Sequence, residues 1–150
     1  MLAFKELQDI LQITIKWEEK IKELYEVAEY GLKDMEAKNV IVFLKENHTS
    51  RLDILKNLKV KDYGATEWVR FSADYKTNDL ITAKIIRKDS TALEICNVIL
   101  EYENKIRDFY EKIANNLKTA SQKELFESLT SFKDEQISRI KNFKDQKLCK

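Results

Sequence analysis

The sequence contains no proline and only two glycines, Gly31 and Gly64, among its 150 residues. Because proline and glycine most often interrupt a helix, their scarcity favours long helices. There are also only two cysteines, and they show no paired spacing. This argues against a disulfide framework and against a cysteine-ligated metal module. We expect Cys96 to be a buried thiol and Cys149 to be a free thiol in the tail.

Long apolar runs and a charge excess of one sign are absent as well. No apolar run approaches the roughly 18 residues of a membrane span, and the amino terminus lacks the basic and then apolar pattern of a signal peptide. The 27 Lys and Arg residues are mixed with 26 Asp and Glu residues, which gives a formal net charge of +1. Such a chain has no basic surface for nucleic acid or for an anionic membrane. We therefore expect a soluble cytoplasmic protein that binds neither.

The residues that are present predict an all-α fold in one domain, residues 1–150. Hydrophobic residues make up 43% of the chain and charged residues 35%, and apolar positions recur at alternating spacings of three and four. Asp34, Thr91 with Glu94, and Ser121 with Glu124 are candidate helix caps. The predicted helices span about 2–32, 35–58, 91–117 and 121–144, with a crossover at 59–90 that contains a short helical piece at 78–87. The two short turns and the long crossover predict a four-helix bundle of two helical hairpins.

The chain contains an internal repeat. Residues 18–25, EEKIKELY, return 85 residues later as residues 103–110, ENKIRDFY. Residues 45–52, KENHTSRL, match residues 133–140, KDEQISRI, at an offset of 88. Each hairpin is therefore one copy of the same unit, and corresponding residues are expected at corresponding places in the bundle.

Polar residues interrupt the apolar seam of every predicted helix at the same level. They are Glu18, Lys45, His48, Glu103, Lys133 and Gln136. A buried carboxylate is costly unless a cation or a hydrogen bond meets it, so we expect these side chains to contact one another. Tyr25 and Tyr110 each follow a seam glutamate by seven residues. Packing is the default role of both, and the alternative is that one of them donates a hydrogen bond to a buried carboxylate.

This arrangement resembles the rubrerythrin-type branch of the ferritin-like superfamily. Members of this family carry one Glu on each of two helices and a Glu-x-x-His pair on each of the other two, and they bind two iron or manganese ions. The residues that carry the resemblance are Glu18 with Tyr25, Glu103 with Phe109 and Tyr110, and His48 with Leu52 and Leu55. The resemblance covers nearly the whole chain. It implies a ferritin-like fold with a long crossover between the second and third helices, a homodimer, and diiron chemistry such as peroxide reduction, oxygen chemistry or iron handling.

Three of the six expected metal ligands are missing. Lys45 and Lys133 stand where the motif has its acids, and Gln136 stands where it has its second histidine. A protonated lysine has no lone pair and repels a metal ion. We therefore favour a layer of salt bridges in which the two ammonium groups replace the metal ions.

The favoured function is a non-enzymatic structural or interaction role, with no catalytic residues and no cofactor. The alternative is a residual metal site, mononuclear or diiron, on Glu18, His48 and Glu103 that binds iron, manganese or zinc and supports a weak oxidoreductase or iron-handling activity. A third possibility is a small molecule in a cavity of the bundle, although nothing in the sequence identifies that ligand.

Overall fold

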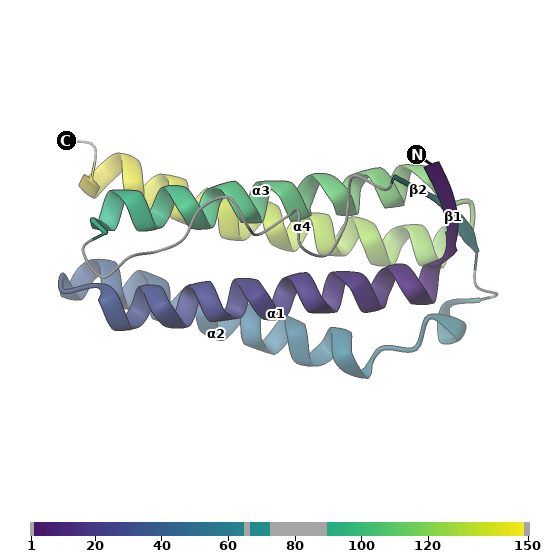
Figure 1. Ribbon diagram of the computed structural model, residues 1–150, viewed down its shortest axis with the longest axis horizontal. Helices are drawn as coiled ribbons and strands as arrows, with labels where there is room; N and C mark the ends of the chain where they lie inside the picture. Colours follow the sequence, from purple (N-terminus) through teal and green to yellow (C-terminus); the bar gives the residue numbers. More distant parts are fainter. Residues whose placement is uncertain (1, 65–66, 73–89, 149–150) are drawn as a thin grey trace.

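The computed structural model describes residues 2–64, 67–72 and 90–148, and four long helices dominate it (Figure 1). The helices are α1 (Leu7–Gly31), α2 (Met35–Asn57), α3 (Ala92–Asn116) and α4 (Ala120–Phe143), with the short helices η1 (Val60–Tyr63) and η2 (Lys144–Leu148) and the strands β1 (Leu2–Glu6) and β2 (Trp68–Ser72). The bounds of α2, α3 and α4 differ from the predicted ranges by one residue at most. The expected short helix at 78–87 lies outside the described residues.

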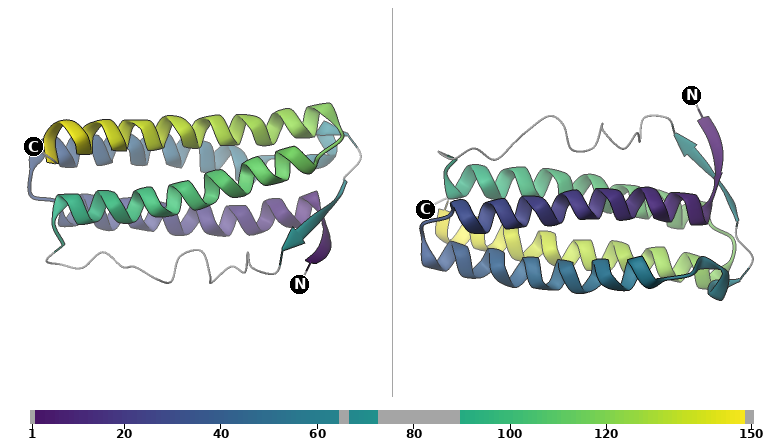
Figure 2. Two further views of the ribbon diagram at one scale, coloured as in Figure 1. Left: turned by 90° about the horizontal axis from the view of Figure 1, so that it is seen from above. Right: turned by 60° about the horizontal axis from the view of Figure 1, so that its bottom comes forward.

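The four long helices form a bundle, as the sequence predicts. Helix α1 packs against α2 and α3, and α4 packs against α3 and α2. Helices α1 and α4 run in one direction along the bundle, whereas α2 and α3 run in the other (Figures 1 and 2). Among the described segments, no helix is long and apolar enough to cross a membrane.

The first helix begins at Leu7, so the prediction that it starts near residue 2 is wrong. The preceding strand β1 pairs antiparallel with β2, and the backbone N–H of Leu7 donates to the Glu67 carbonyl at 2.9 Å. The expectation of an all-α fold included neither strand. A short strand is stabilised by its partner, and here the partner lies more than 60 residues away, so the local pattern could not reveal it.

Two of the three predicted helix caps are confirmed. Asp34 accepts the N–H of Ala37 at 2.8 Å, and the Thr91 hydroxyl accepts the N–H of Glu94 at 3.1 Å. The prediction for Ser121 is wrong, because α4 already begins at Ala120.

The start of α4 is capped by a residue from another part of the chain. The Glu67 carboxylate accepts the backbone N–H groups of Lys118 and Thr119, at distances from 2.8 to 3.2 Å. Burial opposes the charge of this carboxylate, but these hydrogen bonds outweigh it and lower the pKa of Glu67. The Ser121 hydroxyl donates instead to the Tyr63 carbonyl at 2.6 Å, which ties η1 to α4.

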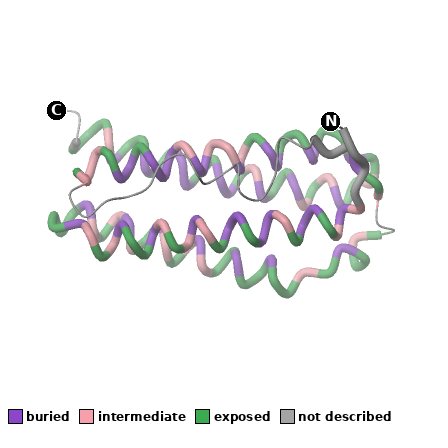
Figure 3. The backbone as a smooth tube through the Cα atoms, in the orientation of Figure 1, coloured by how far each residue is buried: buried purple, intermediate pink, exposed green. Residues whose placement is uncertain are grey.

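The buried residues face the centre of the bundle (Figure 3). The predicted seams of α1 and α4 are buried throughout, and so is the seam of α3 apart from Ala92. On α2 the inward position belongs to Leu44 rather than Lys45. Trp17 is fully buried and packs edge-on against Phe109 with ring centroids 4.8 Å apart. Cys96 is a buried free thiol as predicted, and Cys149 lies outside the described residues.

Candidate functional site: a buried ionic layer

A lysine lies at the centre of the bundle between two glutamates. Lys133 on α4 is fully buried, and its Nζ lies 2.6 Å from Oε1 of Glu18 and 2.9 Å from Oε1 of Glu103. The two acids come from α1 and α3, so a single ammonium group links three helices. The sequence placed all three residues at one level, and the structure brings them into direct contact.

The charges in this layer stabilise one another against the cost of burial. Burial alone would raise the pKa of Glu18, but the Lys133 ammonium and His48 outweigh it and hold the pKa at about 2. For Lys133, burial would lower the pKa, but the charges of Glu103 and Glu18 raise it above its usual value. Lys133 therefore remains an ammonium ion. Only a neutral amine can ligate a metal or act as a nucleophile, so Lys133 can do neither.

Two tyrosines approach the acids from the opposite repeat. The Tyr25 hydroxyl on α1 donates to Oε2 of Glu103 on α3 at 3.2 Å. Tyr110 on α3 faces Glu18 on α1 closely enough that, besides burial, the carboxylate raises the pKa of its hydroxyl, but the hydroxyl has no partner among the described residues at good hydrogen-bond geometry. Burial, followed by the nearby carboxylate, raises the pKa of both tyrosines well above the usual value. Both therefore stay protonated and neutral.

His48 and Gln136 complete the layer with unequal contacts. Nε2 of His48 lies 3.6 Å from Oε1 of Glu18, and neither nitrogen of this fully buried ring has a hydrogen-bond partner among the described residues. Gln136 turns its amide to the backbone and donates from Nε2 to the Leu44 carbonyl at 3.0 Å. His48 thus lies next to the Glu18–Lys133 ion pair, whereas Gln136 links α4 to α2.

Lys45 does not belong to the layer, so that part of the prediction is wrong. Its side chain is 26% exposed, and its ammonium pairs with Glu29 at 2.5 Å on the outer surface of α1 and α2. The hydrogen bond to Glu29 raises the pKa of Lys45 more than partial burial lowers it. The partner Glu29 was not predicted, although the repeat gave a signal: the second repeat has Ala114 at the corresponding position and so offers no carboxylate there to Lys133.

The donor set does not fit a pair of metal ions. The ammonium of Lys133 touches both carboxylates that a metal pair would need to share, at 2.6 and 2.9 Å. Across the described parts of the chain, no three imidazole, thiol or carboxylate groups are grouped so that they could hold a metal ion. The layer holds the carboxylates of Glu18 and Glu103 and the ammonium of Lys133.

Comparison of the chain with protein-family models, with curated proteins and with solved structures gives no match.

Proposed function

We propose that this protein is a cytoplasmic ferritin-like bundle in which Lys133 occupies the place of the metal ions, and that its role is structural or interactive rather than enzymatic. The observation that carries the proposal is the fully buried ammonium of Lys133 between Glu18 and Glu103. A diiron enzyme needs open coordination positions on ions held by these acids. Here the Lys133 ammonium lies between the two acids instead. An ammonium group can neither coordinate oxygen or peroxide nor exchange electrons.

The directions of the helices support the ferritin-like part of the proposal. Helices α1 and α4 run one way and α2 and α3 run the other (Figure 1), so the connection from α2 to α3 must join opposite ends of the bundle. One long crossover of this kind distinguishes ferritin-like folds from simple up-and-down bundles. The repeat supports it as well, because Tyr25 and Tyr110 face the glutamates of each other's repeat.

Metal analysis of protein purified without chelators tests the proposal. We expect far less than one iron, manganese or zinc ion per chain, and no ferroxidase or peroxidase activity after iron is added. A stoichiometric, tightly held ion would contradict the proposal.

A reversal variant tests whether the layer stands at the position of a metal site. Lys133→Glu combined with Gln136→His restores two ligands beside Glu18, Glu103 and His48, and we expect this double variant to bind iron or manganese. Lys45→Glu is the matched control and should gain no metal, because Lys45 lies outside the layer. If the double variant folds and still binds no metal, the proposed equivalence is wrong.

One observation favours the second candidate, a mononuclear metal site on Glu18, His48 and Glu103. Both ring nitrogens of the buried His48 lack hydrogen-bond partners among the described residues, and one of them lies 3.6 Å from Glu18. Such a site requires Lys133 to move away from the carboxylates and the three ligands to come closer together than they are among the described residues. About one tightly held ion per chain that His48→Ala abolishes would make this candidate the better account.

A further inference from the structure

A surface cavity lies between the first half of α2 and the last turns of α4. It measures about 440 Å³ and is lined by Glu36, Asn39, Val40, Phe43, Leu44, Arg139, Asn142 and Phe143. On each helix these residues recur every three or four positions and so share one face. We call this hollow the α2–α4 cavity. Its lining contains one acid, one base, two amides and four apolar side chains, so its charges do not favour an ion of either sign alone.

Arg139 marks one end of the α2–α4 cavity. Its guanidinium carbon lies 4.9 Å from the centre of the Phe43 ring, and it forms no ion pair with any residue that the structure describes. Stacking on a ring limits the freedom of an arginine side chain, and the planar N–H fork of arginine matches the two oxygens of a carboxylate. This end is therefore suited to the carboxylate group of a ligand.

Glu36 marks the other end of the cavity. A helix advances about 1.5 Å per residue, so Glu36 lies about 10 Å along α2 from Phe43, on which Arg139 is stacked. Nζ of Lys147 lies 3.3 Å from Oε1 of Glu36, but these two side chains are 49% and 58% exposed. An ion pair this exposed is weak, so the ammonium group of a ligand can replace Lys147 at this end.

The space between the two charges suits a peptide backbone. An extended chain advances about 3.3 to 3.6 Å per residue, so three residues span about 10 Å. The side-chain amides of Asn39 and Asn142 supply donors and acceptors for peptide groups. Val40, Leu44 and Phe143 supply apolar surface for the side chains of the ligand.

We propose that the α2–α4 cavity binds a short peptide of about three residues that has free termini and apolar side chains. Its carboxylate pairs with Arg139, its terminal ammonium pairs with Glu36, and its side chains lie against Phe43 and the apolar residues around it. A zwitterion meets both charges of the cavity, because a simple anion would face the acid and a simple cation would face the base. Binding here depends neither on the buried ionic layer nor on the function proposed above.

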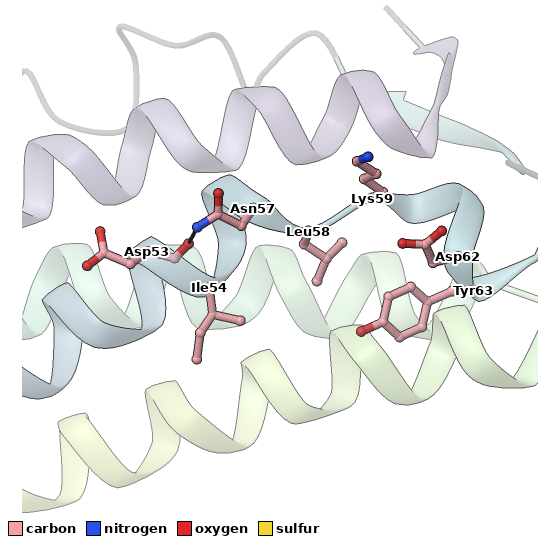
Figure 4. Close-up of a pocket in the computed structure, with 7 residues that line it drawn as sticks. All are labelled: Asp53, Ile54, Asn57, Leu58, Lys59, Asp62 and Tyr63. Atoms are coloured by element: carbon pink, nitrogen blue, oxygen red, sulfur yellow. Dashed lines mark hydrogen bonds between the residues drawn. The ribbon is translucent and has the colours of Figure 1, made fainter.

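The larger cavity near the end of α2 offers a different set of charges. It measures about 660 Å³ and is lined by Asp53, Ile54, Asn57, Leu58, Lys59, Asp62 and Tyr63. In Figure 4 the Asp62 carboxylate, the Tyr63 ring and the side chain of Leu58 lie around one hollow, whereas Lys59 extends in another direction. No arginine is among the described residues that line it, and two acids outnumber its one base. This cavity therefore serves as a control site on the same helix.

Calorimetric titration with modified forms of one peptide tests the site. Trileucine at about pH 6.5 carries both terminal charges, and we expect it to bind with a dissociation constant below about 1 mM. Trileucine amide lacks the carboxylate and N-acetyl-trileucine lacks the ammonium group, so each should bind at least about tenfold more weakly. Triglycine has both charges but no apolar side chain, and it should bind at least about tenfold more weakly as well.

Variants of the two charged residues assign each terminus of the peptide. Arg139→Gln should weaken trileucine binding at least about tenfold, and amidation of the peptide should then change it by no more than about twofold. Glu36→Gln should behave in the same way toward acetylation. The controls are Asp62→Asn in the other cavity and Lys141→Gln, a cation of α4 outside the lining, and both should bind trileucine like the wild type.

Two results overturn the proposal. One is a wild-type chain that binds trileucine with a dissociation constant above about 1 mM. The other is amidation that weakens binding equally in the wild type and in Arg139→Gln, because the carboxylate would then not meet Arg139. Circular dichroism confirms that each variant folds.

Discussion

The two repeats of this protein place equivalent residues differently. In the second repeat Lys133 is fully buried between two carboxylates, whereas in the first repeat the equivalent Lys45 lies at the surface. The repeats also differ at a third position, which is Glu29, the partner of Lys45, in one repeat and Ala114 in the other. Lys45 pairs with the surface acid Glu29 and so avoids the cost of desolvation. Lys133 instead pairs with the two buried acids.

The asymmetry extends to the other members of the layer. Tyr25 donates to Glu103, but the equivalent Tyr110 forms no hydrogen bond among the described residues. His48 lies 3.6 Å from Glu18, whereas the equivalent Gln136 binds a backbone carbonyl. One ammonium therefore serves both acids. The two repeats share a sequence pattern, but the contacts of their charged residues differ.

The largest difference between the repeats should appear on replacing each lysine by methionine. Lys133→Met leaves Glu18 and Glu103 buried without their cation, and we expect a loss of about 3 to 5 kcal/mol in the free energy of unfolding. Lys45→Met should cost less than about 1 kcal/mol, because its ion pair is partly exposed. Chemical denaturation of both variants measures the two values. Equal losses would show that the two lysines are equivalent after all.

Acid should weaken the buried layer of Glu18, Glu103 and Lys133. The pKa of Glu18 is about 2 in the folded chain and near 4.5 when unfolded, so the unfolded state binds more protons between these values. The stability from Glu18 is thus complete above about pH 4.5 and is lost as the pH falls toward about 2. Unfolding free energies measured across this window should show the loss. Glu18→Gln should remove this part of the pH dependence, and Lys45→Met should retain it; a Glu18→Gln profile parallel to that of the wild type would contradict the assignment.

The sequence predicted the bundle and most of this layer, but not its asymmetry. Helix seams and the repeat depend on local periodicity, which is why Glu18, Glu103, Lys133 and Gln136 lie where they were expected. The position of Lys45 depends on a choice between two partners on another helix. Periodicity cannot resolve this choice, because a long side chain one position from the seam can reach either the core or the surface.

The strands and the start of α4 were not predicted, because their partners are distant in the sequence. Strand β1 exists only with β2, and Glu67 caps α4 from a position more than 50 residues away in sequence. Both contacts are non-local, whereas the confirmed caps at Asp34 and Thr91 lie within three residues of the groups that they bind. The two confirmed caps thus have near partners, whereas the strand pairing and the true cap of α4 have distant ones.

Removal of the two tyrosine hydroxyls should give a smaller but unequal effect. Tyr25→Phe deprives the buried Glu103 carboxylate of its 3.2 Å hydrogen bond, and we expect a loss of about 1 to 3 kcal/mol. Tyr110→Phe should cost less than about 1 kcal/mol, since no described residue bonds its hydroxyl. Thermal unfolding of the two variants under the same conditions provides the comparison. A larger loss for Tyr110→Phe would mean that this hydroxyl, and not that of Tyr25, supports its acid.

The smallest effect should come from the surface pair that keeps Lys45 out of the core. A double-mutant cycle with Lys45→Met and Glu29→Gln should give a coupling energy below about 1 kcal/mol that decreases as salt is added, because both side chains are more than a quarter exposed. The cycle of Lys133→Met with Glu103→Gln should exceed it several-fold and respond little to salt, because that pair is fully buried. Coupling of similar size and salt dependence in the two cycles would mean that burial does not distinguish the two repeats.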